Sequence, residues 1–233
     1  AGLRENFGSM AKPMHPGRAA QAGAVAAMLA AGGFTATPFI VEGRRGVAEV
    51  MSSGRELSRL TDDLGKHWEM FQNGLKPYSC GVVSHAAIDA AIAIHNRPGF
   101  NPDEVEVVNA FVHPLVPELM GKTELKVGLE GKFSSYHCMA VGLIDGAAYP
   151  DQYSDARVAD PKVAAMRQRV KLNVDTTQQE ESVRLVVTMK DGSTIEQVTK
   201  HCSGSPENPL TDEKVNEKFL VMATKALGAA EAK

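Results

Sequence analysis

Cysteine is scarce in this sequence, and the three that it contains are Cys80, Cys138 and Cys202. They are odd in number and widely spaced, and no two of them form a CxxC pair. This pattern excludes a disulfide framework and a zinc knuckle, because both need several cysteines at short spacings. It is typical of the reducing cytosol, and we expect a cytoplasmic location.

Long apolar runs and targeting signals are also missing. The run AGAVAAMLAAGGF is shorter than the roughly 18 residues of a membrane span and is broken by glycines. The opening AGLRENFGSM lacks the cationic and then apolar pattern of a signal peptide. The net charge of −3 gives no general attraction for polyanions. We therefore expect a soluble protein that binds neither a membrane nor nucleic acid.

The common nucleotide-binding and catalytic motifs are absent. The sequence has no GxGxxG, no P-loop and no GxSxG, which removes the standard nucleotide and serine-hydrolase interpretations. Its 7 histidines show neither HxH nor HExxH spacing, so the sequence gives little support for a metal site. We expect no metal and no cofactor.

Strong helix formers dominate the first part of the sequence. RAAQAGAVAAMLAA, over residues 18–31, consists largely of them, and Gly32 and Gly33 end the run. Small residues on nearly every face of this run indicate close packing against other helices. Shorter helical patterns over GRRGVAEVMSS and RELSRLTDDLG continue to about residue 63.

The rest of the chain mixes strands with helices. EVEVVNAFV, over residues 104–112, predicts a strand, and SVRLVVTMKDGSTIEQVTK predicts a hairpin that turns at Asp191-Gly192. Helices are expected over SHAAIDAAIAIHN, FSSYHCMAVGLI and DPKVAAMRQRV, and a closing helix after Thr211. At 233 residues the chain can form one large domain or two small ones. Because βαβ alternation is weak, the order of elements favours an α+β fold.

A cationic cluster lies where the first helical run begins. KPMHPGRAAQ holds Lys12, His15 and Arg18 around two prolines and a glycine, and we expect it to be the loop that opens the helix. A helix N-terminus presents unpaired N–H groups and a positive dipole end, so these side chains would hold a carboxylate there. The alternative is a solvated helix entry.

Other candidate residues come from three short patterns. In SHAAID, His85 and Asp89 lie one helical turn apart, a spacing that suits a proton-transfer imidazole held in one tautomer; the alternative is a first-turn histidine packed at the surface. In FSSYHCMA, Tyr136 carries a hydroxyl that could donate to an oxyanion, although a buried tyrosine is more often a core residue. In GRRG, Arg45 could bind a second carboxylate, or it could be a solvated loop arginine.

Four longer stretches carry a resemblance to a known family. They are GSMAKPMHPGRAAQAGAVAAMLAAGGFT, KPYSCGVVSHAAIDAAI, GKFSSYHCMAVGLIDG and GSPENPLTDEKVNEKF. Together and in this order they resemble the MmgE/PrpD family, which includes 2-methylcitrate dehydratase, cis-aconitate decarboxylase and iminodisuccinate epimerase. The resemblance covers essentially the whole chain, and four ordered motifs are more specific than any one of them.

The resemblance implies part of an all-helical domain plus an α+β lid-like domain, with the active site in the cleft between the two. Residues 1–63 would be the last part of the first helical segment, 64–204 the α+β domain, and 205–233 the segment that returns to the helical domain. Family members carry further helices upstream of the KP-H-G motif. The chain therefore resembles the C-terminal portion of such an enzyme.

The resemblance also places residues in that cleft. It implies that Lys12 holds a substrate carboxylate, with His15, Arg18 and Arg45 as further binding residues. It implies that His85 is the general base or acid and that Tyr136 donates to the leaving group or to the developing oxyanion. These catalytic and substrate-binding roles are expectations, and they require the side chains to lie in that cleft.

The implied activity is that of a lyase or isomerase that moves a proton next to a carboxylate on a small di- or tricarboxylic acid. Dehydration of a 2-methylcitrate-like hydroxy acid is the first expectation, and decarboxylation and epimerisation are the alternatives. Family members are typically homodimers that need no metal, and a second polypeptide could carry the missing helices. The rival interpretation is a non-catalytic subunit that keeps the fold for dimerisation or ligand binding.

Overall fold

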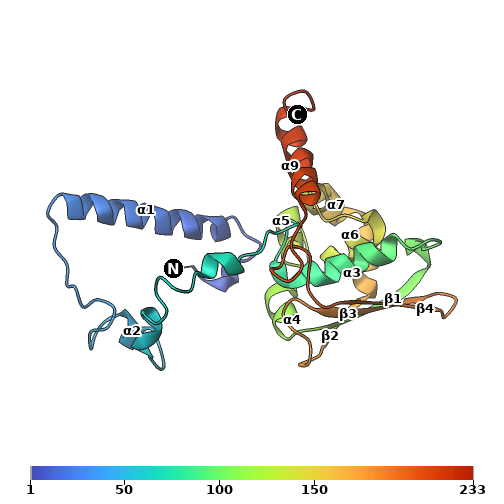
Figure 1. Cartoon of the computed structure of the whole chain (residues 1–233). Helices are drawn as coiled ribbons and strands as arrows, with labels where there is room; N and C mark the ends of the chain where they lie inside the picture. The colour runs from blue at the N-terminus through green and yellow to red at the C-terminus, as the bar shows by residue number, and fades with distance from the viewer. Residues whose placement is uncertain (1, 233) are drawn as a thin grey trace. The chain divides into compact units, whose positions relative to one another are not determined.

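The computed structural model describes residues 2–232, and these fall into two compact units (Figure 1). One unit comprises residues 10–73 together with residues 2–4. The other comprises residues 74–232 together with residues 5–9. Each unit is described below by itself.

The first unit is dominated by the helix α1 (Ala11–Ala31). The expected end at Gly32 is confirmed, but the expected opening loop over residues 12–17 is wrong, because these residues are already helical. Pro13 is compatible with this start, since the N–H groups of a first helical turn have no intrahelical acceptor for proline to remove. Lys12, His15 and Arg18 are therefore residues of α1 rather than of a loop.

The remainder of the first unit contains only short helical pieces within the described residues. They are α2 (Val47–Val50) and the 3-10 turns Leu57–Leu60 and Glu69–Gln72. The short helix expected in GRRGVAEVMSS is confirmed, whereas the one expected over RELSRLTDDLG is only a 3-10 turn. No residue of α1 is buried. A helix of this kind gains little stability until another surface covers it.

The second unit is built on a four-stranded mixed sheet in the order β2-β1-β3-β4. β1 runs parallel to β2 and antiparallel to β3, and the parallel pair requires the helical crossover that separates its strands. The hairpin expected at Asp191-Gly192 is confirmed and joins β3 to β4. The strands are β1 (Val105–Val112), β2 (Val170–Val174), β3 (Val183–Met189) and β4 (Thr194–Thr199).

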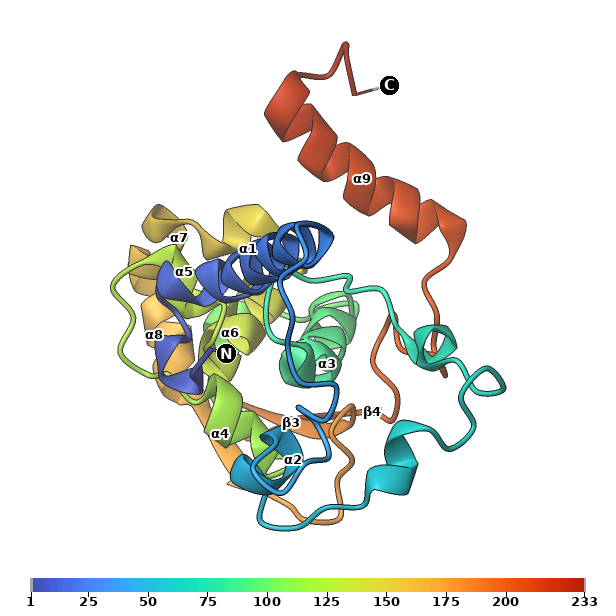
Figure 2. The same cartoon turned by 90° about the vertical axis from the view of Figure 1, so that its left-hand side faces the viewer.

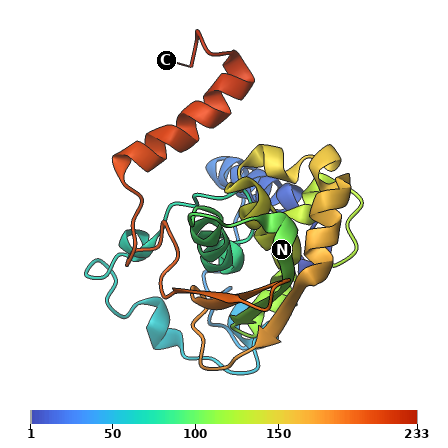
Figure 3. The same cartoon turned by 90° about the vertical axis from the view of Figure 1, so that its right-hand side faces the viewer.

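Helices of this unit pack onto the sheet and onto one another. Figures 2 and 3 show α3 over the strands β3 and β4, and α6 packs against both α3 and α8. The fold is α+β, as the order of elements predicted. The helices are α3 (His85–His95), α4 (Leu115–Met120), α5 (Gly128–Gly131), α6 (Ser135–Asp145), α7 (Asp155–Ala159) and α8 (Pro161–Arg169).

Local capping explains why the helices begin where they do. The Ser134 hydroxyl accepts from the backbone N–H of His137 at the start of α6, and the Asp160 carboxylate accepts from that of Lys162 at the start of α8. Gly146 ends α6 in the left-handed region with a φ of +63°. The predicted helices over FSSYHCMAVGLI and DPKVAAMRQRV are thereby confirmed.

The core lies between the sheet and the helices α3 and α6. Alternate residues of β1 and β3 point into it, as the period of a strand requires. Large side chains from both helices fill the space opposite them. The fully buried members include Val108, Val112, Leu185, Val187, Ile88, Ile94, Met139 and Leu143.

The closing helix is α9 (Asp212–Leu227), and it begins at the predicted cap, Thr211. No residue of α9 is buried, so polar contacts hold its first turns to the unit. The Tyr149 hydroxyl donates to Glu217 at 3.1 Å, and the Lys218 ammonium donates to the carbonyl of Lys76 at 2.5 Å. Among residues 2–232, no helix has the length and apolar character needed to cross a membrane.

Candidate active site

A hollow of about 510 Å³ opens in the second unit at the N-terminal end of α3. Its walls come from the segment before α3, from the loop before β3 and from the loop after β4. Hydrophobic and charged groups therefore meet at one place from three distant parts of the chain. The lining residues are 74–76, Val82, Val83, His85, 179–181 and 202–206.

Two glycines let the walls of the hollow approach each other closely. The backbone N–H of Leu75 donates to the carbonyl of Gly204 at 2.8 Å. Gly204 has a φ of +84°, and a Cβ atom there would lie 1.9 Å from the Leu75 carbonyl oxygen. A Cβ on Gly74 would lie 2.1 Å from the Gly204 carbonyl oxygen. Only glycine fits this crossing, which fixes the loop after β4 against the segment before α3.

His85 is the first residue of α3 and lines this hollow. Its side chain is almost fully buried, at 1% exposure, yet its Nε2 atom has no hydrogen-bond partner within the described residues. Leaving a buried polar atom unpaired costs roughly 1–3 kcal/mol, so this atom needs a partner, which a bound water or a ligand in the hollow could supply. The ring of Tyr78 packs edge-on against the imidazole, with 5.3 Å between the ring centroids.

Asp89 does not hold this imidazole, contrary to the sequence-based expectation. Its Oδ1 accepts from the Tyr78 hydroxyl at 2.5 Å, and its Oδ2 accepts from the backbone N–H of Ser203 at 2.7 Å. Burial and the neighbouring Asp89 carboxylate raise the pKa of Tyr78, which keeps its hydroxyl proton available for this bond. Asp89 therefore fastens two walls of the hollow rather than orienting His85.

Cys80 is a neighbour of His85 and takes part in a buried polar cluster. Hydrogen bonding from Cys138, with a smaller contribution from His85, lowers the pKa of Cys80 against the opposing effect of burial. Burial raises the pKa of Cys138, whose sulfur lies 3.3 Å from the Tyr153 hydroxyl. The cluster thus favours loss of the proton of Cys80 over that of Cys138.

Lys76 is a residue of the hollow that the sequence analysis missed. Its side chain is exposed at the mouth, and its ammonium donates to the carbonyl of Cys80 at 3.5 Å. In KPYSC no other charged residue lies beside it, so it belongs to no cluster that would predict a binding site. Its place at the start of the same stretch that carries His85 was the available signal.

The sequence also matches known families along most of its length. The model of the MmgE/PrpD C-terminal domain matches residues 78–233, and that of the MmgE/PrpD N-terminal domain matches residues 1–60. The chain belongs to the MmgE/PrpD family. Cis-aconitate decarboxylase from Aspergillus terreus is 24% identical over 250 aligned residues, which cover 95% of this chain and 49% of that enzyme. The chain thus spans about half the length of this curated relative.

The MmgE/PrpD N-terminal match contains four of the expected site residues. Lys12, His15 and Arg18 lie in α1, where Arg18 donates to the side chain of Gln21 at 2.7 Å. Arg45 is exposed in the turn that precedes α2. All four belong to the first compact unit, and their binding roles stay predictions.

The C-terminal match contains His85 and Tyr136, which line different hollows. Tyr136 is half-buried and lines a second hollow of about 390 Å³ together with Arg167. His137, its neighbour, is fully buried: its Nε2 donates to the carbonyl of Gln152 at 2.7 Å, and its Nδ1 lies 3.3 Å from the Arg167 guanidinium. The second unit therefore does not bring Tyr136 and His85 together in one hollow.

Residues able to ligate a metal occur at the rim of the first hollow. Among the described residues, Glu181, His201 and Glu207 bring three potential ligand atoms within 4.8 Å of one another. Glu181 also lines the hollow itself. Searching the sequence for HxH and HExxH spacing could not find this group, because its members come from three separate turns.

Proposed function

We propose that this MmgE/PrpD chain forms part of a lyase that moves a proton next to a carboxylate on a small di- or tricarboxylic acid. The observation that carries the proposal is the buried, unpaired Nε2 atom of His85 at the wall of a hollow with Lys76 at its mouth. Membership of the family and the similarity to a cis-aconitate decarboxylase support the same class of chemistry.

The hollow suits such a substrate because it combines a proton-handling group with a fixed cation. Removing a proton next to a carboxylate builds negative charge on an enediolate, and a cation aimed at that charge lowers the barrier. In this proposal Lys76 neutralises a substrate carboxylate at the mouth and His85 takes or returns the proton. Lys12 and Tyr136 do not line this hollow, and the roles that the resemblance implies for them stay separate proposals.

The reaction that follows proton removal is the finer part of the proposal. Loss of hydroxide gives dehydration of a 2-methylcitrate-like acid, loss of carbon dioxide gives decarboxylation, and return of the proton to the other face gives epimerisation. Dehydration is our first choice, and the name of the Aspergillus terreus relative makes decarboxylation the direct competitor. All three share the proton transfer assigned to His85.

The test is an assay of the chain on 2-methylcitrate, citrate and cis-aconitate in deuterated water, followed by proton NMR. We expect deuterium exchange or product formation with at least one acid, and a loss of at least about 100-fold in His85→Gln, as for removal of a general acid or base. Lys76→Ala should mainly weaken binding, while Lys66→Ala, an exposed lysine outside the hollow, is the matched control. Activity that survives both site changes undiminished would remove the assignment.

The second candidate function is a non-catalytic subunit that keeps the fold for dimerisation or ligand binding. The observation in its favour is that neither α1 nor α9 buries any residue, although both expose large apolar side chains such as Met28 and Phe219. Exposed apolar surface of this kind is typical of an interface. Native mass spectrometry separates the candidates: a species joined to a second polypeptide with active chemistry supports the enzyme, whereas an inactive homodimer supports the subunit.

The proposed setting is the cytoplasm, with a homodimer as the working assembly and the proton transfer performed by side chains. All three cysteines are free and buried, which suits a reducing compartment but does not define one. Fractionation of cells that express the tagged chain tests the location. Sedimentation velocity tests the assembly, and a monomer at every concentration would contradict it.

A further inference from the structure

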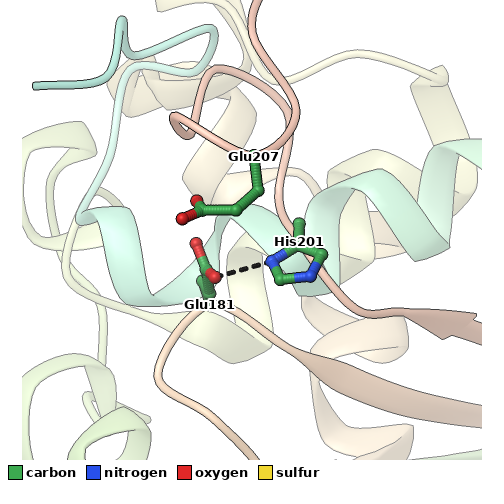
Figure 4. A group of neighbouring side chains, drawn as sticks. All are labelled: Glu181, His201 and Glu207. Atoms are coloured by element: carbon green, nitrogen blue, oxygen red, sulfur yellow. Dashed lines mark hydrogen bonds and ion pairs between the residues drawn. The ribbon is translucent and has the colours of Figure 1, made fainter. Parts of the chain in front are cut away.

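Glu181, His201 and Glu207 converge at one corner of the second unit (Figure 4). The first two are brought together by the register of the β3–β4 hairpin. Val183 pairs with Thr199 at the end of the hairpin, so residues two positions further out on each strand lie opposite each other. Those residues are Glu181 and His201, and the Nδ1 atom of His201 lies 2.7 Å from a carboxylate oxygen of Glu181.

Glu207 reaches the same corner because the chain folds back after β4. The backbone N–H of Gly204 donates to the carbonyl of Asn208 at 2.8 Å, and the Asn208 amide donates to the carbonyl of His201 at 3.2 Å. This turn holds Glu207 above the Glu181–His201 pair, as Figure 4 shows. One imidazole nitrogen and two carboxylates therefore face a common point.

We propose that Glu181, His201 and Glu207 bind one divalent cation of the borderline class, with Zn²⁺ as the best fit. Calcium and magnesium prefer all-oxygen sites, whereas an imidazole with two carboxylates suits zinc. Zinc bonds to these atoms at about 2.0–2.2 Å, so two ligand atoms of one ion lie at most about 4.4 Å apart. The three ligand atoms already lie within 4.8 Å of one another, and all three side chains are at least partly exposed, so small rotations close the site.

Two further observations concern this corner and the hollow beside it. The two carboxylates are like charges held close together, and a cation removes their repulsion. The hollow that Glu181 lines also contains the buried, unpaired Nε2 atom of His85. With three protein ligands, zinc keeps an open coordination position, which a carboxylate oxygen of a molecule in that hollow could occupy. Cation binding itself does not depend on the proposed lyase activity.

The test is isothermal titration of the metal-free chain with ZnCl₂ in a buffer that does not bind zinc. We expect saturation at one equivalent. His201→Ala and Glu207→Gln should each weaken binding at least about tenfold, since even changes beyond the direct ligands weaken zinc sites by 10–100-fold. Cobalt(II) offers a second readout, because a four-coordinate site with one imidazole gives intense visible absorption that His201→Ala should abolish.

Two matched variants guard against other sources of binding. Glu180→Gln removes a neighbouring glutamate that is outside the triad, and Cys202→Ala removes the thiol next to His201; both should leave the titration unchanged. The proposal is overturned if zinc does not saturate at one equivalent, or if His201→Ala binds as the unchanged chain does. It is also overturned if Glu180→Gln or Cys202→Ala weakens binding as much as the triad variants do. Circular dichroism confirms that each variant is folded before titration.

Discussion

The Tyr78 hydroxyl donates to Oδ1 of Asp89, with 2.5 Å between the two oxygens. This bond links the segment before α3 to the second turn of α3 itself. The other oxygen of the same carboxylate accepts from the backbone N–H of Ser203 in the loop after β4. One carboxylate therefore joins three parts of the chain around the hollow that contains His85.

Removing the Tyr78 hydroxyl should destabilise the second unit. Tyr78→Phe leaves the half-buried Asp89 carboxylate without one of its two donors, and hydrogen bonds to charged groups contribute about 1.5–3 kcal/mol. The control is Tyr149→Phe, whose hydroxyl bonds to the more exposed Glu217 and should change the free energy of unfolding by less than about 0.5 kcal/mol. Urea denaturation measures the free energy of unfolding of both variants. Equal decreases would show that the Tyr78 bond stabilises the protein no more than the Tyr149 bond does.

Gly204 should tolerate no side chain. Its φ of +84° disfavours alanine by about 1–2 kcal/mol, and an added Cβ would also lie 1.9 Å from the Leu75 carbonyl oxygen. Gly192 provides a matched control, because its φ is also +84° but no atom lies within 4 Å of its added Cβ. Gly204→Ala should therefore lower the melting temperature clearly more than Gly192→Ala. Equal shifts would mean that backbone conformation alone, and not the crossing with Leu75, explains the glycine.

The parts of the fold that the sequence predicted are those with strong local signals. Asp160 and Thr211 are side-chain caps, Gly146 is a left-handed helix end, and Asp191-Gly192 is a hairpin turn, so each can be read without knowledge of tertiary contacts. The start of α1 was predicted too late in the chain because the two prolines favoured a loop. The first turn of a helix needs few of its N–H groups, so Pro13 fits inside it.

The site was harder to predict because it depends on long-range contacts. His85 was selected for its place at the start of a helix, but its expected partner Asp89 is taken by Tyr78 and Ser203 from outside that helix. The triad of Glu181, His201 and Glu207 depends on the register of two strands and a following turn. No spacing along the sequence expresses that register until the strands are paired.

Two of the three buried thiols, Cys80 and Cys138, give a prediction about charge. Because hydrogen bonding from Cys138 lowers the pKa of Cys80, the Cys80 thiol should be the first of the three to lose its proton as the pH rises. Cys138→Ala removes this donor and should raise the pKa of Cys80 toward that of an ordinary thiol. Ultraviolet absorbance during a pH titration reports thiolate directly.

The remaining cysteine serves as the control for that titration. Burial raises the pKa of Cys202 to about 11, so Cys202→Ala should leave the first thiolate step of the titration unchanged. Cys80→Ala should abolish it. Thiolate absorbance that rises no earlier in the unchanged chain than in Cys138→Ala would contradict the effect assigned to Cys138.

The stability of the second unit should fall on acidification because of His137. Burial lowers the pKa of His137 to about 4 from its ordinary value of 6.5, and its Nε2 donates to the Gln152 carbonyl. The His137 imidazole therefore binds a proton below pH 6.5 in the unfolded chain, but only below about pH 4 in the folded chain. The contribution of His137 to the free energy of unfolding is fully present above pH 6.5. As the pH falls to about 4, the free energy of unfolding decreases by about 3 kcal/mol.

His137→Gln tests this dependence because the glutamine amide can donate in place of the imidazole but does not titrate. The free energy of unfolding of both proteins is measured by urea denaturation at several pH values across this window. Carboxylates titrate in both proteins, so the difference between the two curves isolates His137. We expect that difference to shrink as the pH falls from 6.5 to 4, since only the unchanged chain loses the contribution of a neutral, buried imidazole. Parallel curves would mean that His137 gains its proton equally readily in the folded and unfolded chains.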